Sequence, residues 1–100
     1  MPVGITADEQ KILDEILGRY DYSFYFYGSR VKGNFDRLSD LDILIKGSEK
    51  IPFQALNELK DAFDGSCLPY IVNFADYHDM DEKFYRLIER DLLPFSQREV

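Results

Sequence analysis

The chain has 100 residues, of which 45% are hydrophobic and 15% aromatic, so it fits one domain, expected over residues 1–100, with a packed core rather than disorder. The formal net charge of −7 repels a phosphate backbone and disfavours bulk nucleic-acid binding. No run of about 18 apolar residues is present, so no membrane-spanning helix is expected.

The first predicted helix covers about residues 7–18. Thr6 and Glu9 have the spacing of a capping box, and Gly18 follows the last apolar residue. Apolar side chains recur behind this cap at helical spacing, at Ile12, Leu13, Ile16 and Leu17. The next segment, residues 22–27, is short, aromatic and nearly all apolar, which predicts a strand buried on both faces.

A second strand is predicted over residues 41–46, after a polar segment, residues 29–39, that should form a turn and a short helical piece. Side chains alternate along a strand. One face should therefore carry Leu41, Ile43 and Ile45, and the other Asp40, Asp42 and Leu44.

The second half of the chain predicts a helix, a strand and a helix. Pro52 suits the first position of a helix that ends at Gly65. The apolar face of this helix should carry Phe53, Leu56, Leu59 and Phe63. A third strand follows over residues 70–75. The last helix should start near Asp79 and Glu82, end at about residue 91, and turn inward Phe84, Leu87 and Ile88. These elements predict an α+β fold, a small mixed β-sheet with helices packed on it.

The first strand ends at Gly28 and Ser29, where a helical start follows. Glycine lets the backbone approach a ligand closely, and the N–H groups of a helix start attract phosphate oxygens. The serine hydroxyl can add a hydrogen bond. Arg30 and Lys32 lie beside this turn and could either counter phosphate charge or belong to a solvated loop.

Asp40 and Asp42 should project from the same face of the second strand. Two adjacent carboxylates repel each other unless a cation lies between them. Mg²⁺ is commonly held by one or two carboxylates together with substrate phosphates. This pair therefore predicts a magnesium site, and the preceding Ser39 could orient the Asp40 carboxylate or cap the turn.

The order Gly-Ser, ten residues, Asp-x-Asp, flanked by apolar strands, resembles the signature of the nucleotidyltransferase superfamily that includes DNA polymerase β. Over about residues 8–95 the chain is similar to the minimal nucleotidyltransferases of this superfamily. The resemblance implies that Gly28 and Ser29 grip the triphosphate of ATP. It also implies that Asp40 and Asp42 bind Mg²⁺.

The family's third carboxylate, which helps to bind metal and activates the attacking hydroxyl, corresponds to Asn73 here. An amide oxygen ligates weakly and cannot act as a general base, so activity could be impaired. Asp76 lies three residues further on and should face the other way, as a turn or cap residue. His78 should be exposed in a polar loop. The acidic pair Asp79 and Asp81 indicates a helix start rather than a metal site.

Two hypotheses about function remain open. The resemblance implies a transfer of AMP from ATP to a hydroxyl of a partner, a helical HEPN-type protein, with this chain as the antitoxin of a toxin–antitoxin pair. The alternative is a nucleotide-binding or inactive antitoxin that neutralises a basic, RNA-cleaving partner by contact alone. Direct action on nucleic acid is disfavoured, because no basic groove or stacking platform is evident.

The sequence also indicates a cellular compartment. The N-terminus lacks the basic start and long apolar stretch of a secretory signal. Cys67 is the sole cysteine, which suits a reducing environment, and we expect a cytoplasmic protein. The acceptor, the base preference and the oligomeric state, whether homo- or hetero-oligomer, are not determined by the sequence.

Overall fold

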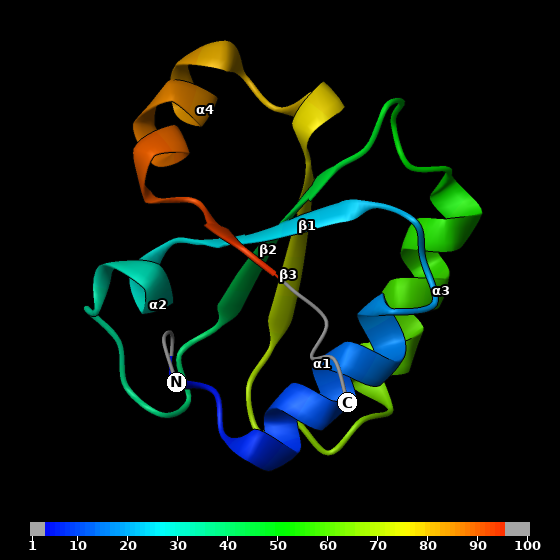
Figure 1. The fold of residues 1–100 in the computed structure, drawn as a ribbon, viewed down its shortest axis with the longest axis vertical. Helices are drawn as coiled ribbons and strands as arrows, with labels where there is room; N and C mark the ends of the chain where they lie inside the picture. The colour runs from blue at the N-terminus through cyan, green and yellow to red at the C-terminus, as the bar shows by residue number, and fades with distance from the viewer. Residues whose placement is uncertain (1–3, 96–100) are drawn as a thin grey trace.

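The computed structural model describes residues 4–95, which form an α+β fold around a four-stranded sheet (Figure 1). The strands lie in the order β3-β2-β1-β4. Strand β1 (Ser23–Tyr27) pairs antiparallel with β2 (Leu41–Lys46) and with β4 (Leu93–Pro94). Strand β2 pairs in parallel with β3 (Val72–Asp76). The predicted fold class, a mixed sheet with helices, is confirmed.

The two longest helices in the described part of the chain, α1 (Ala7–Leu17) and α3 (Phe53–Asp64), lie side by side in Figure 1. Helix α1 begins at the predicted capping box. Thr6 Oγ1 accepts from the Glu9 N–H at 3.2 Å, and Glu9 Oε1 accepts from the Thr6 N–H at 3.1 Å. Helix α3 follows Pro52, which caps the helix instead of starting it.

The shorter elements are grouped around the other parts of the sheet. Helix α2 (Ser29–Lys32) follows β1 directly, and the 3-10 helix η2 (Tyr77–Asp79) follows β3. Helix α4 (Glu82–Ile88) continues into the 3-10 helix η3 (Glu89–Asp91). Within residues 4–95 no helix combines the length and apolar character needed to cross a membrane.

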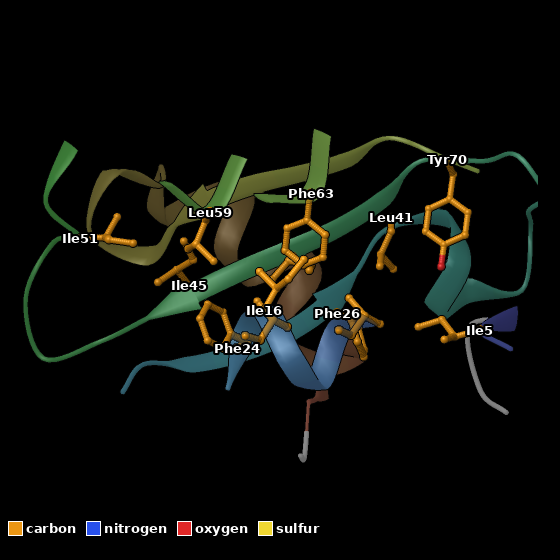
Figure 2. Close-up of a cluster of buried hydrophobic side chains, with 13 residues drawn as sticks. Ile5, Ile16, Phe24, Phe26, Leu41, Ile45, Ile51, Leu59, Phe63 and Tyr70 are labelled. Carbon is orange, nitrogen blue, oxygen red and sulfur yellow. The ribbon is translucent and has the colours of Figure 1, made fainter. Parts of the chain in front are cut away.

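The hydrophobic core lies between one face of the sheet and helices α1 and α3 (Figure 2). The predicted face of β2 is correct, because Leu41, Ile43 and Ile45 are at most 1% exposed. Burying each such side chain contributes about 1.5–3 kcal/mol. Leu44, on the opposite face with Asp42, is also fully buried. A slip of one residue would turn Leu41, Ile43 and Ile45 away from the core and direct Asp42 into it, so the core fixes the register that leaves this carboxylate on the opposite face.

The opposite face of the sheet is partly covered by α4, through polar and aromatic contacts. Lys46 Nζ donates to Tyr85 Oη at 2.8 Å and lies 4.8 Å from the centroid of the Tyr77 ring. The rings of Tyr27 and Phe84 meet edge to face at 6.3 Å. These contacts connect α4 to the face of the sheet that carries Asp42.

The predicted inner face of the last helix is only partly correct. Phe84 is 44% exposed and Leu87 71% exposed, whereas Ile88 is buried. Phe84 and Tyr85 contact the sheet residues Tyr27 and Lys46, and Ile88 is buried, so Leu87 is the predicted residue that lies off this side of the helix. Its N-cap is Asp81 rather than Asp79.

Other predictions are corrected at the edges of the sheet. Strand β1 is not buried on both faces, because Tyr25 and Tyr27 are only partly buried beside the candidate site. Strand β3 covers residues 72–76 instead of 70–75. Phe53, predicted on the apolar face of α3, is 78% exposed. The two-residue strand β4 was not predicted, because so short a segment with a proline gives no strand pattern.

Candidate functional site

The turn between β1 and α2 requires glycine. Gly28 has φ 84° and ψ −156°, a conformation essentially restricted to glycine. Its carbonyl accepts from the N–H groups of Val31 and Lys32, both at 3.2 Å, which closes the first turn of α2. A Cβ atom at this position would also overlap Asp42 Oδ2. The turn therefore lies directly against the Asp42 carboxylate.

Three side chains from the start of β2 and from β3 meet beside this turn. The parallel register places Asn73 opposite Asp42. Asn73 Nδ2 donates to Asp40 Oδ2 at 3.1 Å and to Asp42 Oδ1 at 3.2 Å. The sheet thus brings together Gly28, Asp40, Asp42 and Asn73, which are distant in sequence.

The electrostatics of this cluster favour a cation. Burial raises the pKa of Asp42, the hydrogen bond from Asn73 lowers it, and the nearby charge of Asp40 raises it further, with a net upward shift. Burial, and then the charge of Asp42, also raise the pKa of Tyr27. A cation between the two carboxylates would offset both the burial and the repulsion.

The donor set fits a hard cation such as Mg²⁺. It comprises two carboxylates and one amide, and oxygen atoms of substrate and water commonly complete such a shell. Within residues 4–95, no group of three or more His, Cys, Asp or Glu side chains is arranged to hold a metal. Asn73 would have to present its oxygen, whereas it now donates through its nitrogen.

Arg30 does not lie in a solvated loop, as one interpretation proposed, because its side chain is 2% exposed. Its Nε donates to the Ser39 carbonyl and its Nη2 to the Arg37 carbonyl, both at 2.9 Å. Its guanidinium carbon lies 4.1 Å from the centroid of the Tyr70 ring and 5.1 Å from that of Phe35. Arg30 therefore ties α2 to the loop that ends at Asp40.

The remaining predicted residues have distinct environments. Lys32 is exposed on α2, beside the turn. Of the two roles proposed for Ser39, the structure shows the turn cap. Ser39 Oγ accepts from the Asp36 N–H at 2.9 Å.

Asp76 has the turn role that the sequence predicted. Its Oδ1 accepts from the His78 N–H at 2.8 Å and its Oδ2 from the Ile51 N–H at 2.7 Å. It is buried and engaged opposite Ile45, three residues along β2 from Asp42, so it does not replace the missing third carboxylate. His78 is exposed, as predicted.

Sequence reasoning missed the support that Tyr70 gives to the site. Its hydroxyl donates to Glu9 Oε1 at 3.1 Å, and its ring packs on Arg30. Burial, with the adjacent Glu9 charge, raises the pKa of Tyr70 well above its ordinary value. No sequence pattern identified this contact, because it joins α1, α2 and the segment before β3.

Comparisons with known proteins identify the family of the chain. Residues 9–100 match the nucleotidyltransferase domain family. The chain is 35% identical over 97 residues to the probable protein adenylyltransferase MntA of Haemophilus influenzae, covering 95% of this chain and 85% of that protein. It also resembles one chain of a toxin–antitoxin crystal structure with AMP-PNP, with a TM-score of 0.70 and 18% identity, over 90% of this chain and 74% of that chain.

The chain therefore belongs to the nucleotidyltransferase domain family. Within this family it is of the minimal type that the Gly-Ser and Asp-x-Asp pattern resembles.

Proposed function

We propose that this chain transfers AMP from Mg²⁺-bound ATP to a hydroxyl group of a partner protein. The observation that carries the proposal is the contact between the Gly28 turn and the Asp42 carboxylate, beside Asp40 and Asn73. A relative that is a probable protein adenylyltransferase supports a protein as the acceptor. The related fold crystallised with AMP-PNP, an ATP analogue, is consistent with ATP as the donor.

In this proposal the two sides of the site have separate tasks. The backbone and hydroxyl of Ser29, with Gly28, bind the phosphates, and exposed Lys32 adds positive charge nearby. Asp40 and Asp42 hold Mg²⁺, which would neutralise phosphate charge and stabilise the leaving pyrophosphate. The acceptor oxygen bonds to the α-phosphorus, the bond from that phosphorus to the β-phosphate oxygen breaks, and the hydroxyl proton passes to solvent.

Asn73 sets the proposed limit on this reaction. It can position the two carboxylates through its amide, but it cannot take the proton of the attacking hydroxyl. We therefore propose slow transfer, in which the correct placement of the reactants provides most of the rate enhancement.

The proposed partner is a HEPN-type helical toxin, with this chain as its antitoxin. A relative of this chain is a probable protein adenylyltransferase, which supports a partner protein that brings the acceptor hydroxyl. The net charge of −7 favours association with a basic, RNA-cleaving protein.

A second candidate function is neutralisation of the toxin by binding alone. Asn73 favours it, because an amide at the third carboxylate position carries no charge and cannot act as a general base. Both candidates predict a complex with the toxin, and they differ in whether label from ATP reaches it.

The deciding experiment incubates the protein with ATP labelled at the α-phosphate, Mg²⁺ and the protein encoded by the neighbouring gene. We expect label on that partner, and we expect Asp42→Asn to abolish transfer. Asp64→Asn, an exposed carboxylate at the end of α3, is the matched control and should transfer normally. Absence of label, with wild type and Asp42→Asn neutralising the toxin equally, would establish the second candidate instead.

A further inference from the structure

An apolar groove of about 600 Å³ runs along β3, at the side of the sheet away from β1. Phe74 and Ala75 belong to opposite faces of this strand, so the groove spans its outer edge. Helix α3 contributes one wall, and η2, α4 and the turn between them contribute the other. The apolar lining consists of Ile51, Phe53, Leu56, Phe74, Ala75, Met80 and Phe84.

The groove exposes large aromatic side chains. Phe53 is 78% exposed and Phe84 is 44% exposed, although both belong to amphipathic helices with a buried side. An apolar surface of this kind, rimmed by polar residues, is typical of a binding site.

The groove lies next to the candidate active site. Ala75 lies two residues beyond Asn73 on the same face of β3, roughly 7 Å along the strand. Phe84 contacts Tyr27, and Tyr27 is paired with Asp42 across the sheet. A ligand in the groove would therefore extend to the carboxylate pair.

The in-line geometry of phosphoryl transfer places the acceptor on the β3 side of the site. Attacking and leaving oxygens lie roughly in line in phosphoryl transfer. If the Gly28 turn beside β1 holds the phosphates that leave, the attacking hydroxyl must approach from the opposite side, over β3. Asn73 and then the groove lie on that side.

The charges around the groove determine the chemistry of its occupant. Asp79 and Asp81 line it, and Lys50 is already paired with Asp79 at 3.0 Å. The rim is thus negative, in a chain whose net charge is −7. A complementary segment carries a large apolar side chain flanked by lysine or arginine.

We infer that this groove docks the segment of the partner protein that precedes or follows its acceptor hydroxyl, through an apolar anchor and flanking basic residues. The inference rests on the proposed function, because the in-line argument needs the phosphates at the Gly28 turn. Beyond the proposed function, the groove would select the partner segment and bring its acceptor hydroxyl to Asp40 and Asp42.

The test uses Phe53→Asp, with Leu87→Asp as a control at a similarly exposed apolar residue outside the groove lining. Binding of the purified protein from the neighbouring gene is measured without ATP, and Mg²⁺-ATP binding is measured separately. Loss of the apolar contact that Phe53 would make with the bound segment should weaken partner binding by about tenfold or more. Leu87→Asp should bind within about twofold of wild type, and Mg²⁺-ATP binding should be unchanged in both variants.

A charge variant tests the basic flank. Asp81→Lys should weaken partner binding, and the difference from wild type should shrink as salt screens it. Asp81 makes no side-chain hydrogen bond as the cap of α4, so this change removes no hydrogen bond from the helix start, and the melting temperature of the variant checks that it is folded. Asp64→Lys, at the exposed end of α3, is the matched control and should bind as wild type does.

Three results would overturn the inference. Equal partner binding by wild type and Phe53→Asp, or no binding by either, removes the docking role. Weaker Mg²⁺-ATP binding in Phe53→Asp assigns the groove to the nucleotide base. Conversion of a wild-type dimer to a monomer by Phe53→Asp assigns it to a second copy of the chain. Partner binding that depends on Phe53, without label transfer by wild type, would support the groove and refute only the proposed activity.

Discussion

Replacing Gly28 with alanine would place a methyl group where the Asp42 carboxylate now lies. The backbone at Gly28, with φ 84° and ψ −156°, is also strained for any residue with a Cβ atom, at a cost of about 1–3 kcal/mol. Steric overlap adds to this, and we expect a total loss of about 2–4 kcal/mol in the free energy of unfolding. A domain of this size has about 5–15 kcal/mol, so the variant should still fold.

Gly33→Ala is the matched control. Gly33 also has a positive φ, of 81°, but a Cβ atom there would meet no other atom within 4 Å. Its cost should be about 1–2 kcal/mol, from the backbone alone. In thermal unfolding, Gly28→Ala should lower Tm by roughly 10–25 °C and Gly33→Ala by roughly 5–10 °C.

The two variants should differ more in their affinity for Mg²⁺-ATP than in their Tm. The methyl group of Gly28→Ala displaces Asp42, so Mg²⁺-ATP affinity measured by calorimetry on folded protein should fall at least about tenfold. Gly33→Ala should bind within about twofold of wild type. If both variants bind Mg²⁺-ATP equally well, the contact between Gly28 and Asp42 has no role in the site and the reasoning fails.

Three further predictions concern the same cluster. Asn73→Asp should tighten Mg²⁺-dependent ATP binding or raise transfer, and calorimetry showing neither would place the third metal position elsewhere. At pH values above the ordinary carboxylate pKa, Asp42→Asn should have a higher Tm than wild type, and at lower pH the two should agree. The reason is that the raised folded-state pKa of Asp42 lowers the stability of the wild type once the carboxyl ionises in the unfolded state. An equal Tm difference at all pH values would exclude this linkage. Arg30→Lys should lower the free energy of unfolding by about 2–4 kcal/mol, because one ammonium cannot serve both buried carbonyls and both rings, and a urea titration indistinguishable from wild type would contradict that role.

The sequence alone predicted the elements whose signals are local. The capping box at Thr6 starts α1, and the alternation from Leu41 to Lys46 assigns both faces of β2. Because alternation in a strand is set by backbone geometry, it also placed Asp40 and Asp42 on the face away from the core. The glycine at position 28 was predicted for its close approach to a ligand, and the structure shows that it is also required by Asp42.

Tertiary structure decided what depends on contacts between distant segments. Burial of Arg30 between Phe35 and Tyr70 needs the segment before β3 to pack on α2, and nothing within either segment specifies that. The inner face of α4 was predicted only in part, because the contact between Lys46 and Tyr85 helps to orient this helix alongside its buried Ile88. Periodicity counts apolar residues along one element, whereas these contacts depend on which surfaces the fold brings together.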